Sequence, residues 1–261
     1  MTGKWEQLAH DLAAAWKNGT TIPLPPASDA PATRADAYAV QNRMAELIGG
    51  KVAGWKVGAT VRAVQMFEGH DGPLPGRIFA ARCFNSPARV PANLFKGAKV
   101  ECEFAFRLTR ALPAGRGAIT PEALAASVTF HPAIELAASR YAPGTGNRAA
   151  TTFDGIADNG TGGAAVLGAA VADWASLPFE TMPIDARIDD SPSIQVYTGA
   201  YRRHPLAITA ETFADLRARG VALEAGMCVL TGSLTLPTPI RAGQTLTAQF
   251  ADLAPLKLTF N

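Results

Sequence analysis

The chain has 261 residues, a formal net charge of +2, 48% hydrophobic residues and 18% charged residues. This length allows one large or two small globular domains, and the lack of a basic block gives no indication of nucleic-acid binding. No apolar run approaches the roughly 20 residues that a membrane-spanning helix needs. We therefore expect neither a nucleic acid nor a membrane as a partner.

The cysteines and the N-terminal segment indicate the cellular compartment in which the protein is expected. Cys83, Cys102 and Cys228 are scattered and form no C-x-x-C pair, so they indicate neither a disulfide framework nor a zinc site. The segment MTGKWEQLAHDLAAAW is amphipathic and lacks the apolar core of a signal peptide. Both features favour a reducing cytoplasm.

The periodicity of the chain changes after its first fifty residues. Apolar residues at helical spacing predict helices over 4–17 and 34–48, with a Pro-rich connector between them. One late helix is expected over 205–219. Alternating patterns between Gly and Pro turns predict strands over 52–58, 99–109, 128–137, 184–190, 194–198, 227–231, 245–250 and 255–260. This order predicts an α+β fold, with a small helical part at 1–50 and a β-rich main domain at 51–261.

The stretch KVECEFAF, residues 99–106, places two glutamates one residue apart in an apolar run. On a strand, Glu101 and Glu103 share a face. One interpretation is a solvated face, which antiparallel sheets often have. The other is a divalent cation such as Mg²⁺ or Mn²⁺, which takes carboxylate oxygens.

Two further residues extend the second interpretation. Glu135 lies between Ile134 and Leu136, so a strand that buries these neighbours turns the carboxylate to the other face. Lys56, between Trp55 and Val57 in GWKVGAT, is either an ordinary surface lysine or an acid, base or electrostatic anchor near the carboxylates.

The loop DNGTGG, residues 158–163, is the third candidate site. Its backbone amides and the Thr161 hydroxyl can hold a small carboxylate, although a plain turn fits equally well. Gly160, Gly162 and Ala165 also match a loose dinucleotide fingerprint, which raises a nucleotide-dependent oxidoreductase as a hypothesis. The residues before the loop do not form the hydrophobic strand that this fingerprint requires.

Six segments in order resemble the 2-keto-4-pentenoate hydratase group of the fumarylacetoacetate hydrolase superfamily. They are DAYAVQ, GWKVGAT, VECEFAFRL, HPAIELAASRY, ADNGTGGAAVLG, and HPLAI with the later AGMCVLTGSL, which together span about 36–234. The resemblance implies a mixed β-roll core and one Mg²⁺ or Mn²⁺ ion held by Glu101, Glu103 and Glu135. It also implies a homo-oligomer, which the low charged fraction supports.

The implied activity is hydration of small 2-hydroxy-2,4-dienoates in aromatic catabolism. Lys56 and Glu101 would be catalytic, and Asn159 and Thr161 would bind the substrate. The alternatives are a 4-oxalocrotonate-type decarboxylase and a 2-oxo acid binding relative without hydratase activity. The resemblance also leaves room for a complex with an aldolase or decarboxylase of the same pathway.

The chain departs from the family pattern after the lysine. Leu74, in GPLPG, stands where relatives often carry an acidic residue, and Asp71 or Glu68 are the nearby acids that can replace it. This departure does not change the residues expected to bind the metal. It removes an acidic residue that would be expected to take part in the addition of water. The loop hydroxyl is Thr161 instead of the usual serine.

Overall fold

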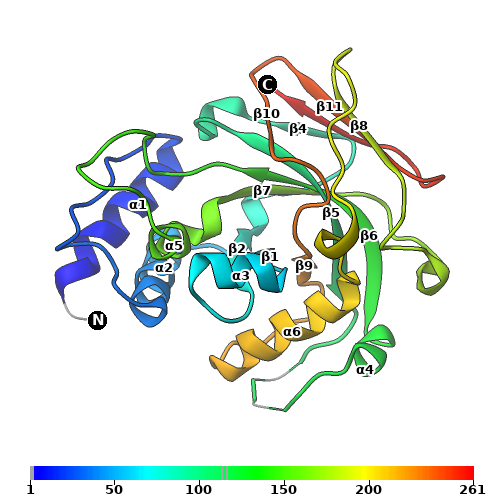
Figure 1. Cartoon of the computed structure of the whole chain (residues 1–261), viewed down its shortest axis with the longest axis horizontal. Coiled ribbons are helices and arrows are strands. Elements are labelled where there is room, and N and C mark those ends of the chain that lie inside the picture. The colour runs from blue at the N-terminus through cyan, green and yellow to red at the C-terminus, as the bar shows by residue number, and fades with distance from the viewer. Residues whose placement is uncertain (1–2, 113, 116) are drawn as a thin grey trace.

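A large curled sheet forms the centre of the computed structural model, which describes residues 3–112, 114–115 and 117–261. Its strand order is β2-β1-β9-β5-β6-β7-β3, with β10 paired to β5 (Figure 1). The β1–β9 and β3–β7 pairs are parallel and the other pairs are antiparallel, so the sheet is mixed. Its strands are β1 (Val52–Gly58), β2 (Leu74–Phe79), β3 (Cys83–Asn85), β5 (Lys99–Leu108), β6 (Val128–Ala137), β7 (Gly162–Leu167), β9 (Cys228–Leu230) and β10 (Thr238–Pro239).

The sheet curls into a half-barrel, because strand β2 at one edge also lies against β7 near the other edge. The loop before β7 approaches β2 closely at Gly76. A side chain at this position would place its Cβ only 2.2 Å from the Asn159 carbonyl oxygen, so the contact requires glycine. The curl brings residues far apart in the sequence to one concave face.

A second, smaller sheet packs against the first and closes the main core. Its order is β4-β12-β11-β8, formed by β4 (Ala88–Val90), β8 (Ile184–Ile188), β11 (Thr245–Phe250) and β12 (Leu256–Phe260). Phe104 of β5 lies among aromatic neighbours, with its ring centroid 5.1 Å from that of Phe179 and 5.9 Å from that of Phe250. This face of β5 is therefore committed to the core, and the opposite face carries the two glutamates.

Helices flank the half-barrel on separate sides (Figure 1). The first two pack together, and their core includes Phe79 and Tyr141 from beyond residue 50. The division of the chain at residue 50 therefore stays a prediction. The helices are α1 (Glu6–Asn18), α2 (Arg34–Ile48), α3 (Arg62–Glu68), α4 (Pro121–Ala125), α5 (Thr152–Ala157) and α6 (Pro205–Ala218).

Local sequence signals explain where these helices begin and end. The Thr33 hydroxyl accepts a hydrogen bond from the Asp36 backbone amide and caps α2. Gly19 adopts the left-handed conformation that ends α1. Within the described residues, no helix combines the length and the apolar character that a membrane crossing requires.

The secondary structure differs from the sequence predictions in one predicted strand and in several short elements that were not predicted, namely α3, α4, α5, β2, β3, β4, β7 and β10. The strand predicted over 194–198 is wrong, because Val196 makes only an isolated bridge to Thr235. Strand β2 was not predicted, because its Pro75 and Gly76 are typical of turns. As an edge strand, β2 tolerates a proline that donates no backbone hydrogen bond.

Candidate active site

Three glutamates meet on the concave face of the large sheet. Glu101 of β5 pairs directly with Glu135 of β6, and Glu103 lies two residues further along β5. One carboxylate oxygen from each of the three lies within 4.8 Å of the others. Glu103 is 1% exposed and Glu135 is 2% exposed, so a solvated strand face is the wrong interpretation for these two.

The surrounding groups satisfy these carboxylates only in part. The Gly232 backbone amide donates to Glu103 Oε2 at 2.7 Å. Lys56 Nζ donates to the Gly160 carbonyl at 2.9 Å and lies 3.4 Å from Glu135 Oε1. This ion pair lacks hydrogen-bonding geometry, and Glu135 Oε1 has no hydrogen-bond partner among the described residues. Lys56 is 12% exposed at its side chain, so it is not an ordinary surface lysine.

The crowded carboxylates perturb one another. Burial, followed by the charge of Glu135, raises the pKa of Glu101 to about 7, against the opposing effect of Lys56. The same burial and the two neighbouring carboxylates raise the pKa of Glu103 well above its usual range. Burial lowers the pKa of Lys56, but the three carboxylates outweigh it and the net shift is upward. When all three carboxylates are ionised, the site therefore carries more negative charge than one ammonium group balances.

A divalent cation fits this donor set. Three carboxylate oxygens converge, two of the side chains are buried, and a buried oxygen of Glu135 has no hydrogen-bond partner in the part of the chain that the structure describes. Mg²⁺ and Mn²⁺ prefer such hard oxygen ligands and keep further positions for water or substrate. The arrangement therefore has the composition of a metal centre with an adjacent lysine.

The loop from Asp158 to Gly162 is held from beneath by a buried ion pair. Arg140 bonds to the Asp158 carboxylate, and its Nη1 donates to the Gly162 carbonyl at 2.8 Å. The Ser139 hydroxyl also donates to Asp158, at 2.9 Å. The Ser-Arg pair of the HPAIELAASRY segment thus fixes the loop that carries Thr161.

The two loop residues predicted to bind substrate have different environments. The Asn159 carboxamide accepts from the Arg77 backbone amide at 2.7 Å and donates to the Arg77 carbonyl at 2.9 Å. Asn159 is 2% exposed and lines neither of the cavities described below, so its side chain joins the loop to β2. Thr161 lines a cavity beside Lys56.

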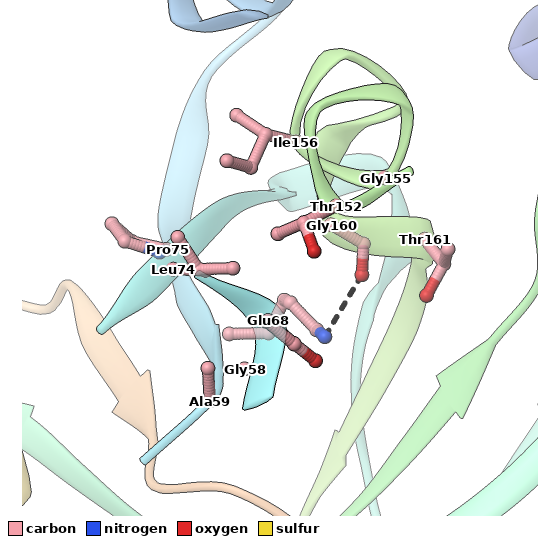
Figure 2. Close-up of a pocket in the computed structure, with 11 residues that line it drawn as sticks. Gly58, Ala59, Glu68, Leu74, Pro75, Thr152, Gly155, Ile156, Gly160 and Thr161 are labelled. Atoms are coloured by element: carbon pink, nitrogen blue, oxygen red, sulfur yellow. Dashed lines mark hydrogen bonds between the residues drawn. The ribbon is translucent and has the colours of Figure 1, made fainter. Parts of the chain in front are cut away.

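Two cavities meet at Lys56, and Gly58, Ala59 and Glu68 also line both. The larger, of about 570 Å³, contains Glu101 and Glu103 and is bordered by Val57, Val61, Val64, Tyr197, Tyr201, Ser233 and Pro237, among others. The smaller, of about 240 Å³, extends past the Lys56–Gly160 hydrogen bond to Leu74, Pro75, Ile156 and Thr161 (Figure 2). Together they form a continuous lining from Thr161, past Lys56, to Glu101 and Glu103.

The structure separates the two acids proposed to replace the one absent at Leu74. Glu68, at the end of α3, lines both cavities, and Figure 2 shows it in the lining. Asp71 has a side chain that is 87% exposed, pairs with Arg62 and lines neither cavity. Leu74 contributes an apolar wall to the smaller cavity.

Sequence reasoning did not identify several residues of this site. Gly232 and Ser233 follow strand β9 in the segment TGS, whose only signal was its place in the family pattern. Tyr197 and Tyr201 stack with their ring centroids 5.8 Å apart at the larger cavity. Tyr197 lies in the segment 194–198 that was predicted as a strand and Tyr201 lies just after it, and neither side chain was assigned to the site.

The glycines of the loop do not form a dinucleotide site. Strand β7 begins at Gly162, inside the fingerprint, and helix α5 precedes it. The dinucleotide fold requires the opposite order, a strand that leads through the glycines into a helix. The oxidoreductase hypothesis loses its structural basis.

Comparison with known proteins identifies relatives of the chain. A scan against models of protein families gives no match. The chain is 29% identical over 234 residues to the 4-oxalocrotonate decarboxylase of Pseudomonas sp. strain CF600, covering 87% of this chain and 86% of that protein. It is 30% identical over 228 residues to the 2-keto-4-pentenoate hydratase of Burkholderia vietnamiensis, covering 86% of this chain and 85% of that protein. The chain belongs to the family of these hydratases and decarboxylases. The resemblance inferred from the six segments is therefore confirmed.

Solved structures agree on the fold of this hydratase and decarboxylase family. The 4-oxalocrotonate decarboxylase from Pseudomonas putida G7, complexed with magnesium and adipate, superimposes with a TM-score of 0.84. The alignment covers 100% of this chain and 98% of that one at 23% identity. The expected mixed β-core of the fumarylacetoacetate hydrolase type is thus confirmed as a curled half-barrel.

Proposed function

We propose that the protein is a metal-dependent hydratase of small 2-hydroxy-2,4-dienoates that carry a single carboxylate. Family members named as hydratases and decarboxylases act on related small acids, so membership alone leaves both reactions open. The two reactions demand different substrates. A 4-oxalocrotonate-type decarboxylase must accept a second carboxylate at the far end of its substrate, and a pentadienoate hydratase does not.

The lining of the two cavities is the observation that favours a hydratase over a decarboxylase. Among the described residues, Lys56 is the only cationic side chain in either lining, and Glu68 adds a negative charge to both. The far end of a bound acid instead meets Leu74, Pro75 and Ile156, or the stacked Tyr197 and Tyr201. A buried carboxylate without a partner is costly, and an uncharged chain suits this surface.

Nearby arginines are committed to other partners. Arg77 donates to the side-chain oxygens of Gln41 and Asn42 at 2.9 and 2.6 Å. Arg203 pairs with Glu211 and donates to the Thr60 carbonyl at 2.7 Å. Neither arginine is part of the two cavity linings, and both guanidinium groups already have these partners.

The metal, proposed to be Mg²⁺ or Mn²⁺ held by Glu101, Glu103 and Glu135, would supply Lewis-acid stabilisation of negative charge on the substrate's 2-oxygen. The Gly232 amide fixes Glu103 in its position. We propose that Thr161 donates to the substrate carboxylate. The Lys56 ammonium, anchored by Gly160, stabilises the negative charge that develops at the 2-oxygen when the 2-hydroxyl proton leaves.

The reaction then has two stages. The dienol loses its 2-hydroxyl proton and gains a proton at C5, which gives 2-oxopent-3-enoate from the five-carbon substrate. Water then adds its oxygen at C4 and a hydrogen at C3, which gives 4-hydroxy-2-oxopentanoate. The polarised 2-oxo group makes C4 electrophilic, so the same stabilised 2-oxygen serves both stages.

A decarboxylase is the second candidate, and one observation favours it. A separate cavity of about 460 Å³ carries Lys96 and Lys99 and shares only Thr161 with the smaller cavity beside Lys56. A diacid whose far carboxylate reached these lysines would suit decarboxylation. The cavities that contain Lys56 and Glu101 do not include either lysine, so we favour hydration.

Product analysis separates these functions. The protein with Mg²⁺ is incubated with 2-hydroxypenta-2,4-dienoate and, separately, with 4-oxalocrotonate, and the products are identified by NMR. We expect 4-hydroxy-2-oxopentanoate from the first and little carbon dioxide from the second. Rapid decarboxylation that Lys99→Ala abolishes would establish the second candidate, and binding of both acids without turnover would establish a binding protein. The homo-oligomer and a complex with a pathway enzyme stay predictions.

A further inference from the structure

We infer that Glu68, oriented by His70, is the catalytic residue that transfers the proton during water addition. This inference rests on the proposed hydratase function and assigns a residue to its second stage. Glu68 belongs to the short segment between β1 and β2, which lies outside the sheet that carries the metal-ligating glutamates.

The segment turns Glu68 inward while its neighbours face solvent. Met66 and Phe67 are 68% and 91% exposed, whereas the Glu68 side chain is 31% exposed and lines both cavities. Gly69 follows in the left-handed conformation, with φ of +73°, and ends helix α3. Gln65 ties the segment to the site, because its Nε2 donates to the Ala59 carbonyl at 2.8 Å.

His70 fixes the direction of the Glu68 carboxylate. His70 Nε2 lies 2.9 Å from Glu68 Oε2, and the His70 side chain is only 4% exposed. An ionised carboxylate accepts hydrogen bonds and cannot donate, so Nε2 carries the hydrogen in this bond. The other ring nitrogen, Nδ1, is buried without a hydrogen-bond partner among the described residues. The imidazole is therefore committed to Glu68 and acts as a positioning residue.

The other acids near the substrate are unsuited to this task. Glu101, Glu103 and Glu135 converge on one point and are the proposed metal ligands. Asp71 is exposed and paired with Arg62. In the described part of the two cavity linings, Glu68 is thus the acidic side chain left to handle a proton.

The proton transfer balances as follows. The Glu68 carboxylate takes one proton from the water molecule while the water oxygen bonds to C4 of 2-oxopent-3-enoate. The electron pair of the C3–C4 double bond moves to give the enolate of the 2-oxo acid. Glu68 then returns the proton to C3, so one water molecule is added and the carboxylate is regenerated.

The test compares Glu68→Gln with Asp71→Asn, which removes a charge from the same segment. Three rates are followed: dienol ketonisation above the buffer rate, hydration of 2-oxopent-3-enoate, and hydration of the dienol. We expect Glu68→Gln to lose hydration by about 100-fold or more, the scale of general acid–base catalysis, and to accumulate 2-oxopent-3-enoate. Ketonisation should stay within a few-fold of wild type, and Asp71→Asn should retain all three rates. Binding of 2-oxopentanoate with Mg²⁺, measured by calorimetry, should be unchanged in both variants.

Three further variants test whether the effect of Glu68 is only structural. Glu68→Asp should recover part of the hydration rate, and added formate should raise hydration by Glu68→Ala but not by Asp71→Asn. His70→Phe should lower hydration less than Glu68→Gln does, because the carboxylate is kept.

The outcomes distinguish a failure of the role of Glu68 from a failure of the proposed hydratase function. Hydration by Glu68→Gln at the wild-type rate overturns the role of Glu68 and leaves the hydratase standing. Equal loss of ketonisation and hydration also overturns it, because Glu68 then serves the site as a whole. A wild-type protein that adds no water to 2-oxopent-3-enoate overturns both.

Discussion

Glu101 and Glu135 are directly paired in register on the antiparallel strands β5 and β6. Side chains at such positions have Cβ atoms about 4.5–5.5 Å apart, and like charges there destabilise a sheet. Glu103 adds a third carboxylate within 4.8 Å, and Lys56 is the cation next to them. The three carboxylates therefore destabilise the fold by mutual repulsion when no metal is bound, and a divalent ion would remove this repulsion. The first predictions rest on this difference.

Loss of one buried carboxylate should remove the metal. For Glu103→Gln or Glu135→Gln, we expect Mg²⁺ affinity, measured by calorimetry, to fall by more than the ~10–100-fold that loss of a supporting outer residue costs. Glu180→Gln, at an exposed position, removes the same charge and should bind Mg²⁺ like wild type. Normal Mg²⁺ binding by both site variants would show that these carboxylates are not the ligands.

The pH dependence of stability should depend on metal. Burial and Glu135 raise the pKa of Glu101 to about 7 in the folded protein, above its value in the unfolded chain. The folded state then binds the proton more tightly, so this contribution to stability is present at low pH and lost as the pH rises through about 7. We expect the Tm of metal-free protein to fall by a few degrees over this range.

Mg²⁺ should oppose that loss, because it binds the ionised carboxylates and competes with protons. The stabilisation by Mg²⁺ should therefore be larger at about pH 8 than at about pH 5. The measurement is thermal unfolding with chelator and with Mg²⁺. A pH profile of Tm in Glu101→Gln that matches wild type in the absence of metal would contradict the assignment.

Lys56→Met should lose turnover while keeping the metal. The ammonium acts where negative charge develops on the 2-oxygen, so we expect kcat to fall by about 10²–10⁴-fold. Mg²⁺ affinity should be retained, since the carboxylates supply the ligands. Kinetics and calorimetry on the same preparation provide the check. If the variant fails to fold with or without Mg²⁺, the role of Lys56 is structural instead.

A cation at the rim of the larger cavity should change substrate preference. Tyr201 is 53% exposed, so Tyr201→Arg can be introduced without disturbing the core. We expect kcat/KM for a dicarboxylic dienol to rise by about five-fold relative to the monocarboxylic substrate. This corresponds to ~1 kcal/mol, the upper end for an exposed ion pair. Tyr201→Phe is the control and should leave the ratio unchanged; an equal ratio in Tyr201→Arg would argue against a neutral site for the far end.

The buried pair beneath the loop should matter more for stability than an exposed pair of the same kind. Asp158→Ala leaves the Arg140 guanidinium buried without its partner, which typically costs ~3–5 kcal/mol. Asp185→Ala removes a pair with Arg187 whose side chains are 53% and 52% exposed, and the free energy of unfolding should change little, because solvent screens such a pair. Urea unfolding of both variants tests this difference. Similar losses in the two would remove Arg140–Asp158 as the support of the loop.

The sequence by itself determined the strands that carry the carboxylates. Alternation in KVECEFAF and the apolar neighbours of Glu135 specify which face each side chain takes, because successive residues on a strand point to opposite faces. The same local patterns predicted helices α1, α2 and α6 and strands β5 and β6. The family resemblance followed from short segments whose order along the chain is a property of the sequence.

Only the tertiary structure decided what those side chains meet. Whether Glu103 and Glu135 face solvent or a closed site depends on the curl of the sheet, which no local pattern encodes. The same is true of Lys56, which reaches Glu135 from a strand separated from β6 by β9 and β5. The choice between Glu68 and Asp71 depends on how the segment after β1 turns, and that direction is set by the contacts of Gln65, Gly69 and His70. Local periodicity specifies a face, whereas burial and partners arise from packing between residues distant in the chain.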